Sequence, residues 1–145
     1  MRKSLGVLLK KIGLDKMGVQ EKKYKILVVD DEDDIVELLK YALKDEFELT
    51  TAIDGQEAIK MMEASSPDLI ITDIYMPILN GLDLIKEVKK NSLIPIIVIS
   101  GSRLQDKANF FDTQGVSHIL EKPFSIRQLK AKIRSILEPS LQAQT

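Results

Sequence analysis

The chain has 145 residues, of which 30% are charged and 44% hydrophobic, with a formal net charge of −1. This length and balance predict a single globular domain and exclude both a disordered chain and a pair of domains. The absence of cysteine excludes disulfides and thiolate metal sites, and no apolar run approaches the roughly 18 residues of a membrane span. We therefore expect a cytoplasmic protein.

Residues 1–23 form a basic leader with seven basic and two acidic residues, a net charge of +5, whereas the rest of the chain carries −6. Its apolar residues recur with helical spacing at Leu5, Leu8, Leu9 and Ile12. Three interpretations stay open: a helix that docks on a partner or a membrane surface, a leader without fixed structure, or a true start at Met17. We favour a leader without a function of its own, and membrane contact is the less favoured reading.

The first half of the domain alternates strand and helix patterns. Residues 25–29, in which four apolar residues follow Lys25, run into Asp30-Asp31, and this predicts a strand buried on both faces. A helix follows, with apolar residues from Ile35 to Leu43 and acids at its positive end. Residues 48–53 predict an edge strand. A second helix should begin at Asp54 and stop before residues 65–67, Ser-Ser-Pro.

The second half repeats this alternation. Residues 69–72 predict another buried strand that runs into Asp73, and Leu82, Ile85 and Val88 then mark the third helix. Residues 96–99 and 119–121 predict the last two strands, which end in Ser100-Gly101 and Lys122-Pro123. Two capping-box patterns, Ser102-x-x-Gln105 and Ser125-x-x-Gln128, predict the starts of the fourth and fifth helices.

Five strands alternating with five helices predict a three-layer α/β fold with right-handed crossovers and a parallel sheet. The carboxyl ends of parallel strands meet at one edge, where open α/β sheets place their ligand sites. Three carboxylates, one hydroxyl and one amine therefore meet there: Asp30, Asp31, Asp73, Ser100 and Lys122. Two carboxylates about 4 Å apart repel by roughly 4 kcal/mol at an effective dielectric constant near 20, so a cation is expected among them.

Five separated motifs resemble the response-regulator receiver domain of bacterial two-component systems. They are Val-Val-Asp30-Asp31-Glu, Ile-Thr-Asp73-Ile-Tyr-Met-Pro77, the later Gly81, Ile-Ser100-Gly101 and Lys122-Pro123-Phe124. The resemblance covers residues 24–138 and leaves residues 139–145 as a tail. It implies the flavodoxin-like, doubly wound five-stranded sheet with strand order 2-1-3-4-5, and a receiver that stands alone.

The resemblance also assigns chemistry to residues. It implies that Asp73 is the phosphoacceptor and that Ser100 and Lys122 bind the phosphoryl oxygens. Asp31, Asp73 and the main-chain carbonyl of Tyr75 would bind Mg²⁺, with Asp30 acting mostly through water. All-oxygen ligation by carboxylates suits this ion.

Some positions near the site imply finer roles. Tyr75 and Ser102 stand where the family modulates water attack on the acyl phosphate, although Ser102 is equally well read as a helix cap. The family usually has Tyr or Phe three residues before its lysine, as a switch that moves with the hydroxyl at position 100. Here Ile119 stands there, so we expect a smaller switch. His118 is read as a packing residue, and the Lys122-Pro123 bond is expected to be cis.

The resemblance implies a phosphoacceptor signalling domain rather than an enzyme, beyond self-catalysed phosphotransfer and slow hydrolysis of its acyl phosphate. The implied partners are a sensor histidine kinase or histidine phosphotransfer protein, and a downstream protein that the sequence does not identify. The acidic body and the lack of a reader helix argue against direct DNA binding. The alternative is a receiver-like module that binds its partner constitutively. A dehalogenase-like phosphatase is disfavoured because Tyr75 replaces its second acid.

Overall fold

The structure, a computed structural model, describes residues 22–101 and 105–138, together with residues 7, 8 and 11. The remainder of the predicted leader helix and Ser102 lie outside the described residues. Strands and helices alternate along the domain. The strands are β1 (Lys25–Val29), β2 (Glu48–Ala52), β3 (Leu69–Thr72), β4 (Ile96–Ser100) and β5 (His118–Glu121). The α-helices are α2 (Asp33–Leu43), α3 (Gly55–Ala64), α4 (Gly81–Asn91), α5 (Ala108–Gln114) and α6 (Ile126–Leu137).

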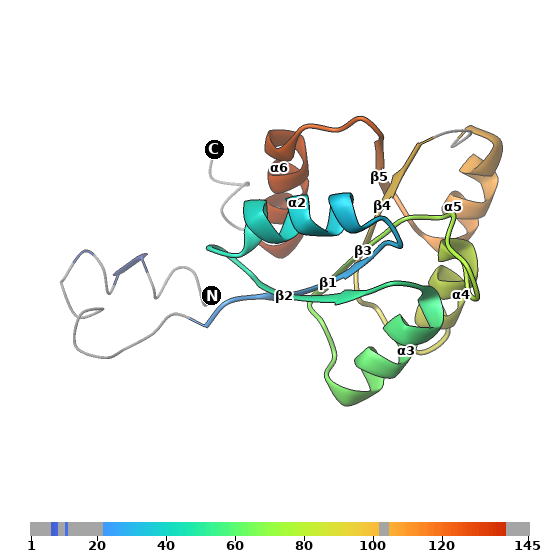
Figure 1. Ribbon diagram of the computed structural model, residues 1–145, viewed down its shortest axis with the longest axis horizontal. Helices are drawn as coiled ribbons and strands as arrows, with labels where there is room; N and C mark the ends of the chain where they lie inside the picture. The colour runs from blue at the N-terminus through green and yellow to red at the C-terminus, as the bar shows by residue number, and fades with distance from the viewer. Residues whose placement is uncertain (1–6, 9–10, 12–21, 102–104, 139–145) are drawn as a thin grey trace.

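The strands form one parallel sheet, as the sequence pattern predicted, and their order β2-β1-β3-β4-β5 is the one that the family resemblance implied. Alternate side chains of a strand point to opposite faces of the sheet, and both faces are buried. Ile26 and Val28 pack with α2 and α6, whereas Leu27 and Val29 pack with α3, α4 and α5. Figure 1 shows α2 and α6 on one side of the sheet and α3 and α4 on the other. The domain is therefore the predicted three-layer sandwich, and His118 lies in β5 as expected.

Helix starts follow the predicted caps in two cases. The Asp54 side chain accepts a hydrogen bond from the backbone N–H of Glu57 at the start of α3. The capping box of Ser125 and Gln128 is present at the start of α6. The prediction for α5 was wrong, because this α-helix begins only at Ala108, after a 3₁₀ turn at Gln105–Lys107. Such tighter turns are common at helix ends.

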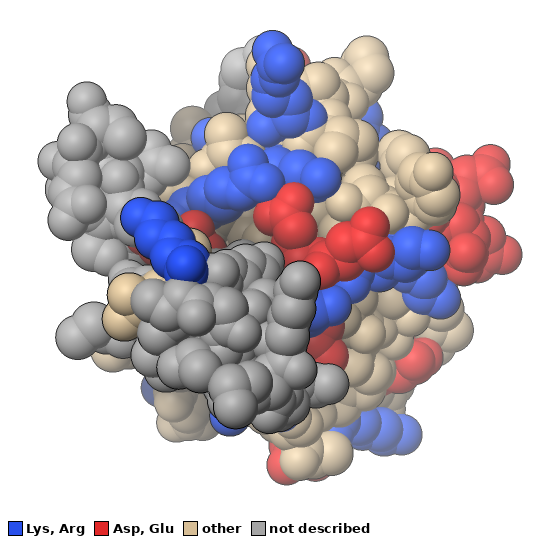
Figure 2. All heavy atoms as spheres, turned by 90° about the vertical axis from the view of Figure 1, so that its left-hand side faces the viewer, with Lys and Arg blue, Asp and Glu red and all other residues tan. Residues whose placement is uncertain are grey.

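The amino-terminal ends of β1 and β2 lie toward the left-hand side of Figure 1, which faces the viewer in Figure 2. Acidic and basic side chains lie next to one another on this face (Figure 2). Glu46, before β2, pairs with two basic residues of α6. Arg134 Nη2 lies 3.0 and 2.8 Å from the two carboxylate oxygens, and Lys130 Nζ lies 3.3 Å from one of them. This cluster joins the start of β2 to the last helix. Within the described residues, no helix is both long enough and apolar enough to cross a membrane.

Candidate functional site

Three carboxylates converge at the carboxyl end of the sheet. Asp30 follows β1, Asp31 is the next residue, and Asp73 follows β3. Each offers an oxygen within 4.8 Å of those of the other two. They meet because Val29 and Thr72 are paired in the sheet, so that both strands deliver their next residue to the same place. Asp30 and Asp73 are buried, with 3% and 5% of their surface exposed, whereas Asp31 is open to solvent.

Backbone contacts hold Asp73 firmly. Its N–H donates to the carbonyl of Val29 at 3.0 Å, and its Oδ1 accepts a hydrogen bond from the N–H of Ile74 at 2.6 Å. Gly81, the first residue of α4, packs directly on this turn, and its N–H donates to the carbonyl of Ile74 at 2.8 Å. A Cβ at position 81 would lie 2.0 Å from the carbonyl oxygen of Asp73. Only glycine therefore fits beside the aspartate.

Asp30 is a buried acid under electrostatic pressure. Burial raises the pKa of its carboxyl group, and the nearby negative charge of Asp73 acts in the same direction. A hydrogen bond from the backbone N–H of Glu32 at 2.9 Å and the charge of Lys122 oppose this without cancelling it. A cation between the acids would relieve both the desolvation and the repulsion.

Lys122, after β5, supplies part of that positive charge. Its Nζ lies 3.1 Å from Asp73 Oδ2 and 3.5 Å from Asp30 Oδ2, and only 18% of the side chain is exposed. A third carboxylate, that of Glu32, lies 3.0 Å from the same Nζ. Burial acts to lower the pKa of Lys122, but the hydrogen bonds to Glu32 and Asp73 together with the charge of Asp30 outweigh it, and the pKa is raised. The ammonium group therefore stays charged.

Glu32 is a site residue that the sequence reasoning missed. It belongs to the acidic run from residue 30 to residue 34, which was interpreted as favourable charge at a helix N-terminus. Glu32 occupies the cap position of α2, yet its side chain makes no capping hydrogen bond. The sequence offered one signal for this role: a glutamate stands at the start of the helix, and glutamate is not among the preferred capping residues. Its carboxylate is therefore available to bind another group.

Ser100 ends β4 with its side chain completely buried. Its Oγ has no hydrogen-bond partner, and it is the one such buried side-chain atom among the described residues. An unpaired buried hydroxyl costs free energy and calls for an explanation. The adjacent backbone is paired, since the carbonyl of Ser100 accepts a hydrogen bond from the N–H of Lys122 at 2.9 Å. The hydroxyl is thus an unused hydrogen-bond donor on a residue whose backbone is paired with Lys122.

The remaining predicted residues surround this group. The Tyr75 ring is 51% exposed and lies 5.5 Å from the ammonium nitrogen of Lys107. Ile119 pairs with Val98 in the sheet and packs on the core beneath α3, α4 and α5. A Cβ on Gly101 would meet no atom within 4 Å. The Lys122-Pro123 bond is cis, as expected from the sequence.

The donor set fits a magnesium ion. Three carboxylates with oxygens within 4.8 Å of one another provide the hard ligands that Mg²⁺ prefers, and the exposure of Asp31 leaves room for water. Among the described residues, this is the one group of at least three acidic or histidine side chains close enough to share an ion.

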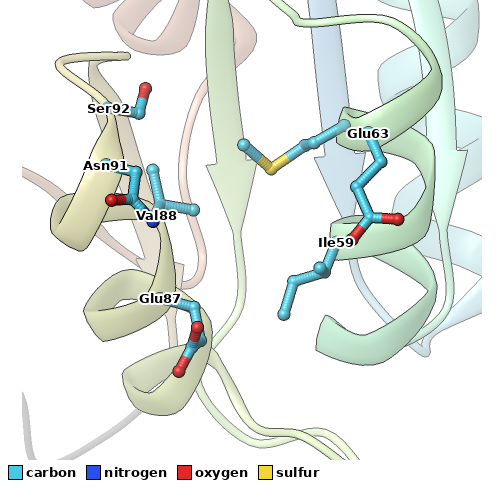
Figure 3. Close-up of a pocket in the computed structure, with 7 residues that line it drawn as sticks. Ile59, Glu63, Glu87, Val88, Asn91 and Ser92 are labelled. Carbon is cyan, nitrogen blue, oxygen red and sulfur yellow. The ribbon is translucent and has the colours of Figure 1, made fainter.

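A separate groove lies between α3 and α4 (Figure 3). It has a volume of about 290 Å³, an apolar lining that includes Ile59 and Val88, and the carboxylates of Glu63 and Glu87 at its edge. Its α4 residues come from the last turns of an eleven-residue helix that begins beside Asp73. At 1.5 Å per residue, the groove is roughly 10 Å or more from the acids, so it does not belong to the same site.

A sequence model described as "Response regulator receiver domain" matches residues 26–134. The chain belongs to this family. The acids at the end of its sheet are compatible with Mg²⁺ binding.

Individual relatives agree with this assignment. The chain is 39% identical over 119 residues to the alkaline phosphatase synthesis transcriptional regulatory protein PhoP of Bacillus subtilis, a match that covers 80% of this chain and 49% of PhoP. It is 35% identical over 114 residues to the response regulator SaeR of Staphylococcus aureus, covering 77% of this chain and 50% of SaeR. The chain thus spans about half the length of these curated relatives.

The chemotaxis response regulator CheY4 of Vibrio cholerae superimposes with a TM-score of 0.73 at 29% identity, covering 80% of this chain and all of CheY4. The similarity to a solved receiver therefore extends over the whole of that smaller protein.

Proposed function

We propose that this receiver accepts a phosphoryl group on Asp73 from a phosphohistidine of a sensor kinase or a histidine phosphotransfer protein. The observation that carries the proposal is the buried Asp73 carboxylate with the Lys122 ammonium 3.1 Å away and two further acids within 4.8 Å. A carboxylate oxygen of Asp73 forms the new bond to phosphorus while the bond from phosphorus to the donor nitrogen breaks. The nitrogen keeps the electron pair as the imidazole leaves.

The side chains around Asp73 supply charge placement, which is most of what phosphoryl transfer requires. The Lys122 ammonium neutralises a phosphoryl oxygen, and the unpaired hydroxyl of Ser100 donates a hydrogen bond to another. Asp30, Asp31, Asp73 and the main-chain carbonyl of Tyr75 would hold Mg²⁺, with Asp30 acting mostly through water. When bound, the ion offsets the negative charge of the acids and of the incoming group.

The output of residues 24–138 is proposed to be a change in protein contact that depends on phosphorylation, in the cytoplasm. Residues 24–145 carry a net charge of −6, which disfavours direct DNA contact by this part of the chain. The alternative is a module that binds its partner constitutively. It leaves the buried hydroxyl of Ser100 without a purpose, and for that reason it is the weaker proposal.

The test is incubation with acetyl phosphate and Mg²⁺, followed by measurement of the intact mass. The wild-type protein should gain one phosphoryl group, and this gain should disappear when Mg²⁺ is chelated. Asp73→Ala should gain none, whereas Asp112→Ala, which removes an exposed acid on α5, should behave as the wild type. Phosphorylation of Asp73→Ala to the wild-type extent would refute the assignment.

A further inference from the structure

The ammonium group of Lys122 is held from two sides. Asp73 accepts one of its hydrogen bonds at 3.1 Å and Glu32 accepts another at 3.0 Å, while Asp30 is more distant at 3.5 Å. Asp73 and Glu32 belong to different loops, one after β3 and one at the start of α2. The Lys122 ammonium therefore bridges the buried carboxylate of Asp73 and the exposed carboxylate of Glu32, at the solvent side of the site.

The position of Glu32 is itself fixed by the backbone. Its N–H donates to Asp30 Oδ1 at 2.9 Å, and its carbonyl accepts the hydrogen bond from Val36 at 3.1 Å that opens α2. Since the side chain makes no capping hydrogen bond, it reaches Lys122 from an anchored backbone. A lysine side chain has several rotatable bonds and loses conformational entropy when it is ordered. An anchored acceptor at the rim reduces the number of orientations that the ammonium group can take.

We propose that Glu32 is a positioning residue that holds the Lys122 ammonium over Asp73 for contact with the phosphoryl group. This inference rests on the function proposed above. When the lysine bond to Asp73 Oδ2 passes to a phosphoryl oxygen, the bond to Glu32 keeps the ammonium at the mouth of the site. Glu32 acts through Lys122 and does not itself contact the phosphoryl group.

The experiment measures the affinity for beryllofluoride, a mimic of the phosphoryl group, at a fixed saturating concentration of Mg²⁺. Glu32→Ala should weaken binding about two- to fivefold, which is the range expected for the loss of an ion pair whose acid is exposed to solvent. Glu32→Gln keeps an acceptor oxygen and should recover part of this loss. Glu37→Ala is the matched control, since it removes an exposed acid of α2 whose carboxylate pairs with Lys40 instead of Lys122.

A double-mutant cycle separates positioning from a general effect of charge. In a Lys122→Ala background, Glu32→Ala should have no further effect on the affinity for the mimic, because the residue through which it acts is gone. The Lys122 ammonium group, observed by ¹⁵N NMR, gives a second readout. Its protons should exchange with solvent faster in metal-free Glu32→Ala than in the wild type.

Three outcomes would overturn the proposal: unchanged affinity in Glu32→Ala, tighter binding that indicates competition for the lysine, or an equal loss in the Lys122→Ala background. Failure of the wild type to bind the mimic or to accept phosphate would instead contradict the proposed function. The wild-type measurement therefore distinguishes the two kinds of failure.

Discussion

Replacement of Gly81 by alanine tests whether the close approach of α4 to the site is structurally essential. The added Cβ would lie 2.0 Å from the carbonyl oxygen of Asp73 and 2.8 Å from Cα of Ile74, whereas ordinary contact begins near 3.4 Å. The nearest atoms all belong to the backbone, so no side-chain rotation relieves the clash. The turn after β3 or the start of α4 must therefore move by more than 1 Å.

Two effects of opposite sign compete in Gly81→Ala. Alanine in a helix is favoured over glycine by about 1 kcal/mol, whereas overpacking costs about 1–3 kcal/mol. Because the clash is with the backbone, the cost should lie at the upper end of that range. The expected net result is a loss of about 1–2 kcal/mol in the free energy of unfolding. A shift of about 1 Å at Asp73 should also slow phosphorylation by up to roughly a hundredfold.

Urea unfolding and the rate of phosphorylation by acetyl phosphate measure the two effects of this substitution. Gly101→Ala is the control for stability, since its Cβ would have no neighbour within 4 Å, and its free energy of unfolding should stay close to that of the wild type. If Gly81→Ala is as stable as the wild type and is phosphorylated at the same rate, the turn has slack and the steric argument is wrong.

Two further predictions concern the ion pairs of Glu46, just before β2, and Ile119 in β5. Burial acts to raise the pKa of Glu46, but the hydrogen bonds and charges of Arg134 and Lys130 outweigh it and lower the pKa below its usual 4.5. The cluster therefore stabilises the fold above that pH and loses its effect as the pH falls through the lowered pKa. Glu46→Gln should cost about 1 kcal/mol at pH 7. Urea unfolding should find that this deficit shrinks as the pH is lowered progressively below 4.5, and a deficit that does not change on acidification would contradict the assignment. Ile119→Tyr should enlarge the amide chemical-shift changes that beryllofluoride causes on α5, β5 and α6, and equal changes in the wild type would show that isoleucine is a competent switch.

The sequence predicted the sheet and the convergent acids because both follow from local signals. Residues 26–29 are apolar, and residues 69–72 are apolar up to the β-branched Thr72, which indicates strands buried on both faces. Parallel strands bring their ends together. Asp30 and Asp73 were therefore placed correctly from the position of the strand ends. The roles of Asp73, Ser100 and Lys122 came from the family resemblance and stay proposals here.

The long-range pairs could not be predicted in this way. Glu32 and Lys122 are 90 positions apart, and Glu46 and Arg134 are 88 apart. Nothing in the local pattern of either partner identifies the other.

The backbone conformation of Ile78 could not be predicted either. Its φ is 68°, in the left-handed region that glycine favours. Pro77 and Asn80-Gly81 predicted a break in the chain after Asp73, but a break alone does not require a positive φ at a β-branched residue.

The strained backbone at Ile78 belongs to the turn that connects Asp73 to α4. A β-branched residue at positive φ costs on the order of 1–3 kcal/mol and persists where its surroundings dictate the conformation. Here the carbonyl of Leu79 accepts a hydrogen bond from Gly55 at 2.9 Å, and the Asn80 side chain caps α4 at 3.0 Å. These bonds, with the packing of Gly81, fix the turn that begins at Asp73.

The turn that carries Asp73 is thus fixed by backbone contacts. The side chains that are proposed to contact the phosphoryl group differ from Asp73 in this respect. Lys122 is a long side chain shared among three carboxylates, and Ser100 has a buried hydroxyl with no partner. A ligand shifts a conformational equilibrium only through its different affinity for the two states. Under the proposed function, the Ser100 hydroxyl gains its first hydrogen bond and Lys122 exchanges one, and these changes would supply that difference at β4 and β5. The conformational response is therefore expected on the side of the sheet edge formed by β4, β5 and the helices beside them, and the turn after β3 should stay fixed.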